Sequence, residues 1–86
     1  MVNFKPLIIK FFRENNTKKS MTFDEVSFWY IKQNDFNYYP PYLSLWRTII
    51  KSYSMYDSNT KIYYFYWDLI LKDLRVKYKG VEKIEP

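Results

Sequence analysis

The 86-residue chain contains no cysteine, no histidine, no alanine and a single glycine, Gly80. Without cysteine it can form no disulfide, no thiolate nucleophile and no Cys-ligated zinc or iron–sulfur centre. Without histidine it lacks the usual general base near neutral pH and the commonest metal ligand. One glycine cannot build a glycine-rich phosphate-binding loop. These absences exclude most chemistries of small enzymes, so we expect no enzymatic activity, no bound metal and no cofactor.

Long apolar runs are also missing. No stretch reaches the roughly 18 apolar residues that a membrane-spanning helix needs. The apolar run near the N-terminus is short and is interrupted by Lys10, which is unlike a secretory signal peptide. We therefore expect an intracellular protein that does not enter a membrane.

Aromatic and basic residues are abundant. Aromatic residues make up 23% of the chain and hydrophobic residues 48%, which is enough for one core in one small domain. Fourteen Lys and Arg residues against nine Asp and Glu residues give a formal net charge of +5. A basic balance of this kind favours nucleic acid or another anionic partner.

The first predicted helix runs from about Asn3 to Asn15, where apolar residues recur at helical spacing. Asn3 is its candidate N-cap. Pro6 then falls in the first turn, where its missing N–H costs nothing.

The second predicted helix runs from about Phe23 to Gln33. Thr22 and Glu25 have the spacing of a capping box, in which each side chain bonds to the backbone amide of the other residue. Phe28 and Ile31 lie off the main apolar stripe, so we expect this helix to be contacted on two sides.

The third predicted helix begins at Pro40-Pro41 and is the most clearly amphipathic segment. Successive residues rotate by about 100° around a helix. One broad arc is apolar and contains Tyr42, Leu43, Leu45, Trp46, Ile49, Ile50 and Tyr53. The opposite arc has no apolar or acidic residue and contains Ser44, Arg47, Thr48 and Lys51.

Two interpretations fit the segment that follows, from residue 54 to residue 66. Its Tyr and Phe residues surround a polar turn, which favours a hairpin with a four-residue loop, followed by a helix from about Trp67 to Tyr78. Alternatively, Ser58 or Asn59 caps one long helix that ends near Gly80. The first interpretation predicts an α+β fold and the second an all-α four-helix bundle, and we prefer the first.

This order of elements, with a short extended piece near Lys19–Met21, resembles the winged helix-turn-helix domain. It is similar to the small winged-helix regulators of archaeal viruses and their hosts. The resemblance covers about residues 3 to 66. It implies sequence-specific binding of double-stranded DNA by a transcriptional regulator. We expect residues 1–80 to form the domain, including the last helix, and residues 81–86 to form a flexible tail.

The resemblance also implies which residues contact DNA. The third helix of a winged helix enters the major groove, so the candidate contacts there are Ser44, Arg47, Thr48 and Lys51. The hairpin is the wing, and the residues of its tip are Asn59, Thr60 and Lys61.

A third group of candidate contacts precedes the second helix. Lys18 and Lys19 follow the first helix and could hold a phosphate near the start of the second, where backbone amides and the helix dipole favour an anion. Asp24 and Glu25 oppose this arrangement with two negative charges.

The last helix has apolar residues on two sides, and a monomer of this size needs only one of them for its core. An uncovered apolar face indicates a partner surface, most simply a homodimer. The candidate interface residues are Leu69, Ile70, Leu74 and Tyr78.

Two other functions compete with a DNA-binding regulator. The chain could be a protein-interaction module that binds and inhibits a host factor, or a DNA-coating protein without sequence specificity. The aromatic residues around the double proline could also stack unpaired bases, although such loops more often pack on their own core or on a partner. These residues are Phe36, Tyr38, Tyr39 and Tyr42.

Overall fold

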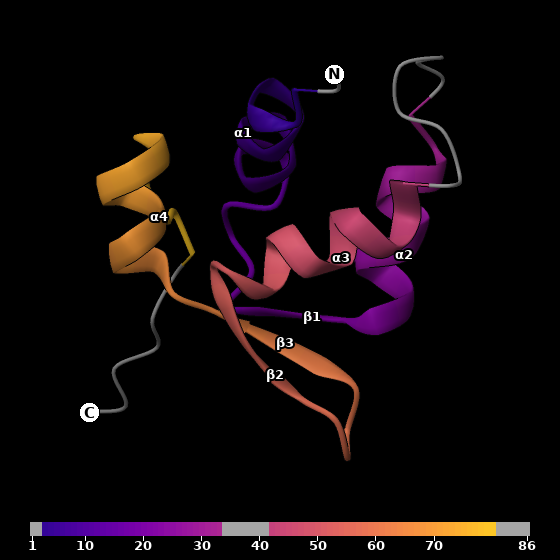
Figure 1. The fold of residues 1–86 in the computed structure, drawn as a ribbon. Helices are drawn as coiled ribbons and strands as arrows, with labels where there is room; N and C mark the ends of the chain where they lie inside the picture. The colour runs from indigo at the N-terminus through magenta and orange to yellow at the C-terminus, as the bar shows by residue number, and fades with distance from the viewer. Residues whose placement is uncertain (1–2, 34–41, 81–86) are drawn as a thin grey trace, which may run out of the picture.

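The computed structural model describes residues 3–33 and 42–80, and these residues form an α+β structure (Figure 1). The elements follow the order α1 (Lys5–Glu14), β1 (Ser20–Thr22), α2 (Phe23–Ile31), α3 (Leu43–Lys51), β2 (Ser54–Asp57), β3 (Ile62–Phe65) and α4 (Trp67–Leu74). This layout is compatible with a winged helix. The predicted loop from Asn34 to Pro40, the start of the third helix at Pro40-Pro41 and the predicted tail at 81–86 lie outside the described residues.

The three strands form one antiparallel sheet in the order β1-β3-β2, with β3 in the centre. The predicted hairpin is confirmed: residues 58–61 connect β2 to β3, and Asp57 pairs with Ile62. Side chains alternate between the two faces of a strand. Tyr63 and Phe65 are therefore buried, while Tyr64 is exposed on the outer face. The sheet excludes the all-α alternative.

The first two helices begin near the predicted positions. Helix α1 begins at Lys5 with Phe4 as its N-cap residue, so the predicted N-cap, Asn3, lies one residue too early. The side chain of Asn3 still accepts a hydrogen bond from the Lys5 amide (3.1 Å). The capping box of α2 is confirmed, because the Glu25 amide donates to Thr22 Oγ1 (3.1 Å) and the Thr22 amide donates to Glu25 Oε1 (3.0 Å). Together with Lys18, whose Nζ lies 3.8 Å from Glu25 Oε2, these bonds hold the pKa of Glu25 below its ordinary value.

The core is an aromatic cluster between α1, α2, α3 and the sheet. Trp46 is 0% exposed, stacks against Trp29 and Tyr30 at centroid distances of 5.5 and 5.4 Å, and meets Phe11 edge-on. Its indole N–H donates to the Val26 carbonyl (3.1 Å). The predicted rotational phase of α3 is therefore correct, since the middle of its apolar arc faces the core.

The apolar arcs of α2 and α3 are only partly covered. Tyr42 and Leu45 are exposed, because the core covers the centre of the predicted α3 arc and leaves its margins in solvent. Phe28 and Ile31 are exposed as well. The expectation that α2 is contacted on two sides is therefore wrong within the described residues, which cover one side of this helix.

Helix α4 ends four residues earlier than predicted. Arg75 takes a left-handed conformation (φ 59°) and ends the helix after Leu74, with its amide bonded to the Leu71 carbonyl (3.0 Å). The chain then turns back across the molecule. The Lys79 amide donates to the Asn16 carbonyl (2.7 Å), which ties this segment to the loop after α1.

The predicted dimer interface on α4 is wrong for two of its four residues. Ile70 is 0% exposed and Leu74 is 5% exposed, because both belong to the core of the chain itself. Leu69 is half-buried, and Tyr78 is half-buried against the Trp67 ring (centroids 5.4 Å apart). The apolar side chain that α4 leaves exposed is Leu71.

Replacing Trp46 by alanine should lower the free energy of unfolding by about 3–5 kcal/mol, because the change empties a large buried site. The matched control is Leu45→Ala, one residue away on the exposed margin, which should cost less than about 1 kcal/mol. Urea denaturation followed by circular dichroism measures both changes. Equal effects of the two variants would contradict this packing of α3.

The contribution of Glu25 to stability should depend on pH. Folding lowers the pKa of this carboxyl, so its stabilising effect is present above the pKa of the unfolded chain, about 4.3, and is lost as the pH falls through the lower folded value. Glu25→Gln should therefore reduce the melting temperature at pH 7 more than at pH 3. The same reduction at both pH values would contradict a capping role for the ionised carboxylate.

Candidate nucleic-acid interface

The outward face of α3 is a row of hydroxyl groups. Because Trp46 and Ile50 are buried, the residues on the opposite side of the helix face solvent. Ser44, Thr48 and Ser52 follow one another there at four-residue spacing, and all three are exposed. The Thr48 hydroxyl donates to the Ser44 carbonyl (3.0 Å), which leaves its lone pairs free to accept hydrogen bonds.

Ser52 is the residue of this row that the sequence analysis missed. It lies at the C-cap of α3, one turn after Thr48. The four-residue spacing from Ser44 through Thr48 extends to it without interruption, so the spacing was the signal that could have identified it.

Arg47 lies at the edge of this face that borders α2. Its guanidinium carbon is 4.6 Å from the centroid of the Phe23 ring, and Nη1 donates to Ser27 Oγ (3.3 Å). Cation–π contacts of this kind contribute about 0.5–1 kcal/mol at exposed sites and more where water is excluded. The two contacts hold the Arg47 side chain beside the first turn of α2, which is also where the hairpin is attached.

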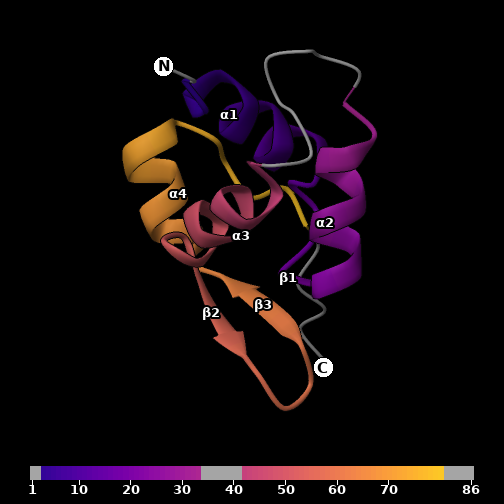
Figure 2. The ribbon, with the colours of Figure 1, turned by 45° about the vertical axis from the view of Figure 1, so that its right-hand side comes forward.

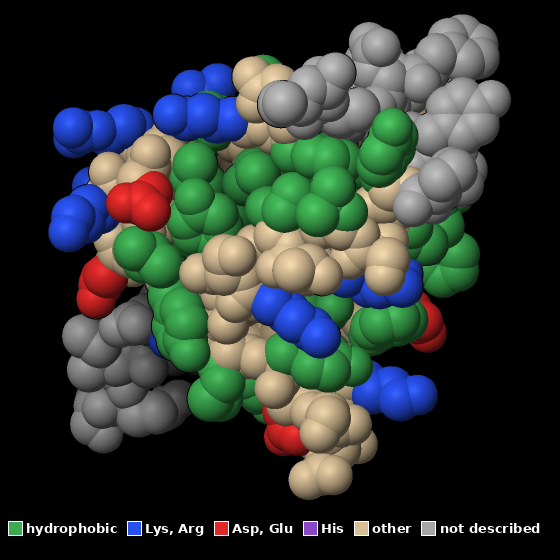
Figure 3. All heavy atoms as spheres, in the orientation of Figure 1, with side chains coloured by type: hydrophobic (Ala, Val, Ile, Leu, Met, Phe, Trp, Pro, Cys, Tyr) green, Lys and Arg blue, Asp and Glu red, His purple; other side chains and the backbone are tan. Residues whose placement is uncertain are grey.

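Lys51 lies on the side of α3 that borders the hairpin. Its Nζ is 4.9 Å from the centroid of the Tyr56 ring on β2. Tyr56 packs in turn against Tyr63 (centroids 4.5 Å apart), and burial raises the pKa of the Tyr63 phenol. In the space-filling view, Lys and Arg side chains lie between α3 and the hairpin, whereas hydrophobic side chains gather between α3 and α1 (Figure 3).

The hairpin projects from the helical part of the molecule, and the turn at its tip contains Asn59, Thr60 and Lys61 (Figure 2). All three are exposed. The Asn59 amide donates to Asp57 Oδ1 (2.9 Å), and this bond, with bonds from Thr60, holds the pKa of Asp57 below its ordinary value. Lys61 takes a left-handed conformation (φ 57°).

The tip is tied to the start of α2. The Phe23 amide donates to the Lys61 carbonyl (2.8 Å), so the hairpin turn, the first residue of α2 and the Arg47 side chain form one connected region. The structure thus brings together two of the predicted groups, the polar face of α3 and the hairpin tip.

Lys18 and Lys19 do not form one phosphate site. Lys18 lies at the start of α2, as predicted, but its ammonium is paired with Glu25. Lys19 instead lines a groove with Trp67 and Tyr78 near α4. The two lysines precede strand β1 and are neighbours in sequence, but they belong to different surroundings in the structure.

Neither a metal-binding cluster nor a membrane-spanning helix occurs in the described ranges, residues 3–33 and 42–80. No group of three or more His, Cys, Asp or Glu side chains there could hold a metal ion. No helix there is long and apolar enough to cross a membrane.

Comparison with known proteins gives no assignment. No protein-family model, no curated protein and no solved structure matches the chain.

Proposed function

We propose that the chain binds double-stranded DNA as a winged-helix protein, with α3 in the major groove and the β2–β3 hairpin beside it. The observation that carries the proposal is the surface of α3: an exposed hydroxyl row at Ser44, Thr48 and Ser52, bordered by two cations and containing no acid. A major groove about 12 Å wide admits one helix presented in this way.

The residues of this surface suit different contacts. Ser44 and Thr48 are exposed on the side of α3 opposite the buried core residues, so they are the residues that would reach base edges. Arg47 lies at the border with α2 and Lys51 at the border with the hairpin, positions that suit phosphates of the DNA backbone. A phosphate contact suits Arg47 better than a contact with a base edge, because Phe23 and Ser27 hold its guanidinium at the edge of α3.

The hairpin would add a second set of backbone contacts. Lys61 supplies a cation at the tip, and Asn59 and Thr60 supply polar groups. The bond between the Phe23 amide and the Lys61 carbonyl joins the hairpin to α2, and the Phe23 ring contacts Arg47 on α3. These contacts support a fixed distance between the hairpin tip and α3.

We keep the proposal that the protein acts as a homodimeric transcriptional regulator. Two copies of α3 would then lie about 34–36 Å apart, or a multiple of that, on a pseudo-palindromic site. Since Ile70 and Leu74 are buried, such a dimer would have to use other apolar side chains, and Phe28, Ile31 and Leu71 are exposed.

A protein-interaction module is the second candidate function. It is favoured by the exposed apolar side chains on α2, where Phe28 is 58% and Ile31 is 49% exposed, and by Leu45 on α3. A surface of this kind is typical of a site that docks another protein. Failure to bind any duplex at low salt would favour this function over DNA binding.

Arg47→Ala and Lys51→Ala should each weaken duplex binding and reduce the slope of log affinity against log salt by about 1, as expected for the loss of one phosphate contact. Thr48→Ala should instead alter the preference among DNA sequences. Gel-shift titration of random and genomic duplexes at two salt concentrations measures both effects.

The matched control is Arg13→Ala. Arg13 is exposed on the side of α1 opposite its buried residues, so this variant removes the same charge away from the candidate interface. Equal loss of affinity in Arg13→Ala and Arg47→Ala would show that net charge alone drives binding and would reject the α3 surface.

A further inference from the structure

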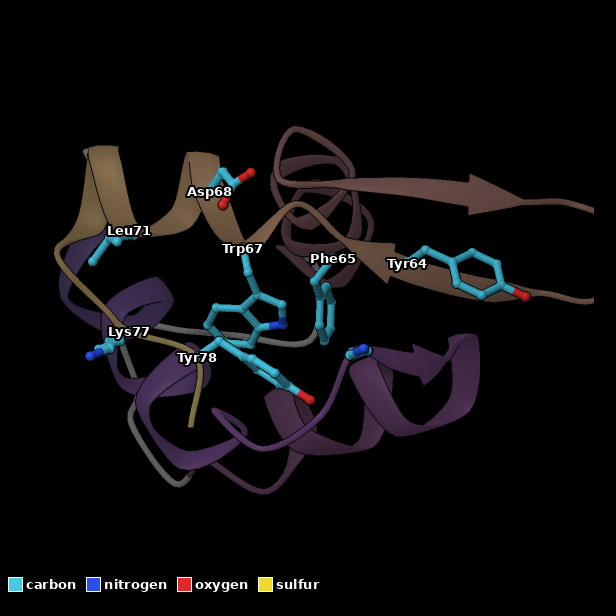
Figure 4. A pocket seen from close by; sticks show the side chains of 8 residues that line it. Tyr64, Phe65, Trp67, Asp68, Leu71, Lys77 and Tyr78 are labelled. Atoms are coloured by element: carbon cyan, nitrogen blue, oxygen red, sulfur yellow. The ribbon is translucent and has the colours of Figure 1, made fainter. Parts of the chain in front are cut away.

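A second candidate site lies outside the α3 surface, in a groove between β3, α4 and the segment that follows α4. It has a volume of about 470 Å³, within the usual size range of ligand sites. Aromatic rings of Tyr64, Phe65, Trp67 and Tyr78 line it, together with Lys19 and Lys77. Figure 4 shows the Trp67 and Tyr78 rings side by side, with Lys77 at one edge of the groove.

Packing holds the Trp67 ring in place. Its indole N–H donates to the Lys18 carbonyl (2.9 Å). Phe12 and Phe65 meet the ring edge-on, at centroid distances of 5.7 and 6.1 Å. Tyr78 lies at 5.4 Å with its plane tilted by 38° and is only half-buried. The pair is thus a supported aromatic surface that remains accessible from solvent.

The only glycine of the chain lies against this surface. A Cβ atom at Gly80 would overlap the phenol oxygen and ring of Tyr78, so only glycine leaves room for Tyr78 in its observed position. The bond from the Lys79 amide to the Asn16 carbonyl fixes the backbone between the two residues. The conformation of Tyr78 therefore depends on residue 80.

The charge of the groove favours an anion. Lys19 and Lys77 line it, and Asp68 is the single acid among the described residues of its lining. Lys77 is exposed, and no hydrogen bond or ion pair engages its ammonium in the described part of the chain. Lys79 adds a further exposed cation next to Tyr78.

We propose that this groove binds unpaired nucleotides of a single-stranded nucleic acid, with a base stacked on Tyr78 and Trp67 and the adjoining phosphates held by Lys77 and Lys19. Aromatic surfaces in cationic grooves are the usual means of holding unpaired bases, and stacking tolerates any base because every base has a π face. The proposed site for single-stranded nucleic acid is therefore separate from the residues that we propose to contact duplex DNA.

Fluorescence anisotropy with labelled dT12 and U12 oligonucleotides tests the proposal on the full chain. Tyr78→Ala should weaken binding about 5- to 150-fold, the effect of losing one base–aromatic stack. Tyr66→Ala is the matched control, since Tyr66 is an exposed aromatic outside the groove lining. For charge, Lys77→Ala should weaken binding more than Lys72→Ala, because Lys72 is exposed outside the groove.

Gly80→Ala provides a second variant that removes no ring and no charge. It should weaken oligonucleotide binding because it displaces Tyr78, while the melting temperature shows that the chain still folds. A base stacked on Trp67 should also quench tryptophan emission. This quenching should persist in Trp29→Phe, which keeps Trp67, and should be much weaker in Trp67→Phe. No binding of either oligonucleotide at low salt, or equal losses in Tyr78→Ala and Tyr66→Ala, would overturn the proposal.

Different variants test duplex binding through α3 and single-strand binding in the groove. Tyr78→Ala should leave duplex affinity unchanged, and Arg47→Ala should leave dT12 affinity unchanged. If Arg47→Ala and Tyr78→Ala weaken dT12 binding equally, the groove is not a distinct site.

Discussion

The burial of Trp46 determines which side of α3 faces solvent. The indole stacks on Trp29 and Tyr30, meets Phe11 edge-on, and satisfies its N–H on the Val26 carbonyl. A ring of this size cannot move to the surface without opening a large cavity between α1, α2 and α3. With that position filled, geometry places Ser44, Thr48 and Ser52 on the outside. The candidate interface therefore follows from a packing constraint in the core.

Phe23 connects this core to the rest of the candidate interface. The Arg47 guanidinium lies over its ring, and its amide donates a hydrogen bond to the Lys61 carbonyl at the hairpin tip. Lys51 reaches the same hairpin through Tyr56. The start of α2, one edge of α3 and the tip of the hairpin thus share contacts. A surface held in this way needs little reordering when it binds a rigid partner.

Local signals in the sequence were sufficient for much of this structure. The Thr22–Glu25 spacing, the polar turn between two aromatic segments and the 100° rotation of α3 each involve residues that are close in sequence, and each predicted its element correctly. The end of α4 was not predictable in the same way, because Arg75 takes a left-handed conformation that is rare for a residue other than glycine. The segment that follows Arg75 is held by a bond between residues distant in sequence, from the Lys79 amide to the Asn16 carbonyl, and no local pattern predicts that bond.

In the candidate sites, too, the sequence predicted what depends on local spacing and not what depends on contacts distant in sequence. Helical rotation identified the polar face of α3, but it gave no indication that Arg47 would be held against Phe23. Apolar spacing in α4 could not say which residues the chain would bury itself, and Ile70 and Leu74 were misassigned for that reason. The groove at Trp67 and Tyr78 combines segments that are far apart in sequence, including Lys19, so no local pattern could predict it.

The most direct test of the account is a titration of the ¹⁵N-labelled chain with a short DNA duplex, followed by amide chemical shifts. Binding through α3 and the hairpin predicts that the largest shifts fall at Ser44, Thr48 and Ser52 and in the turn at residues 58–61. Shifts concentrated at Phe28 and Ile31 on α2, with none along α3, would contradict the account.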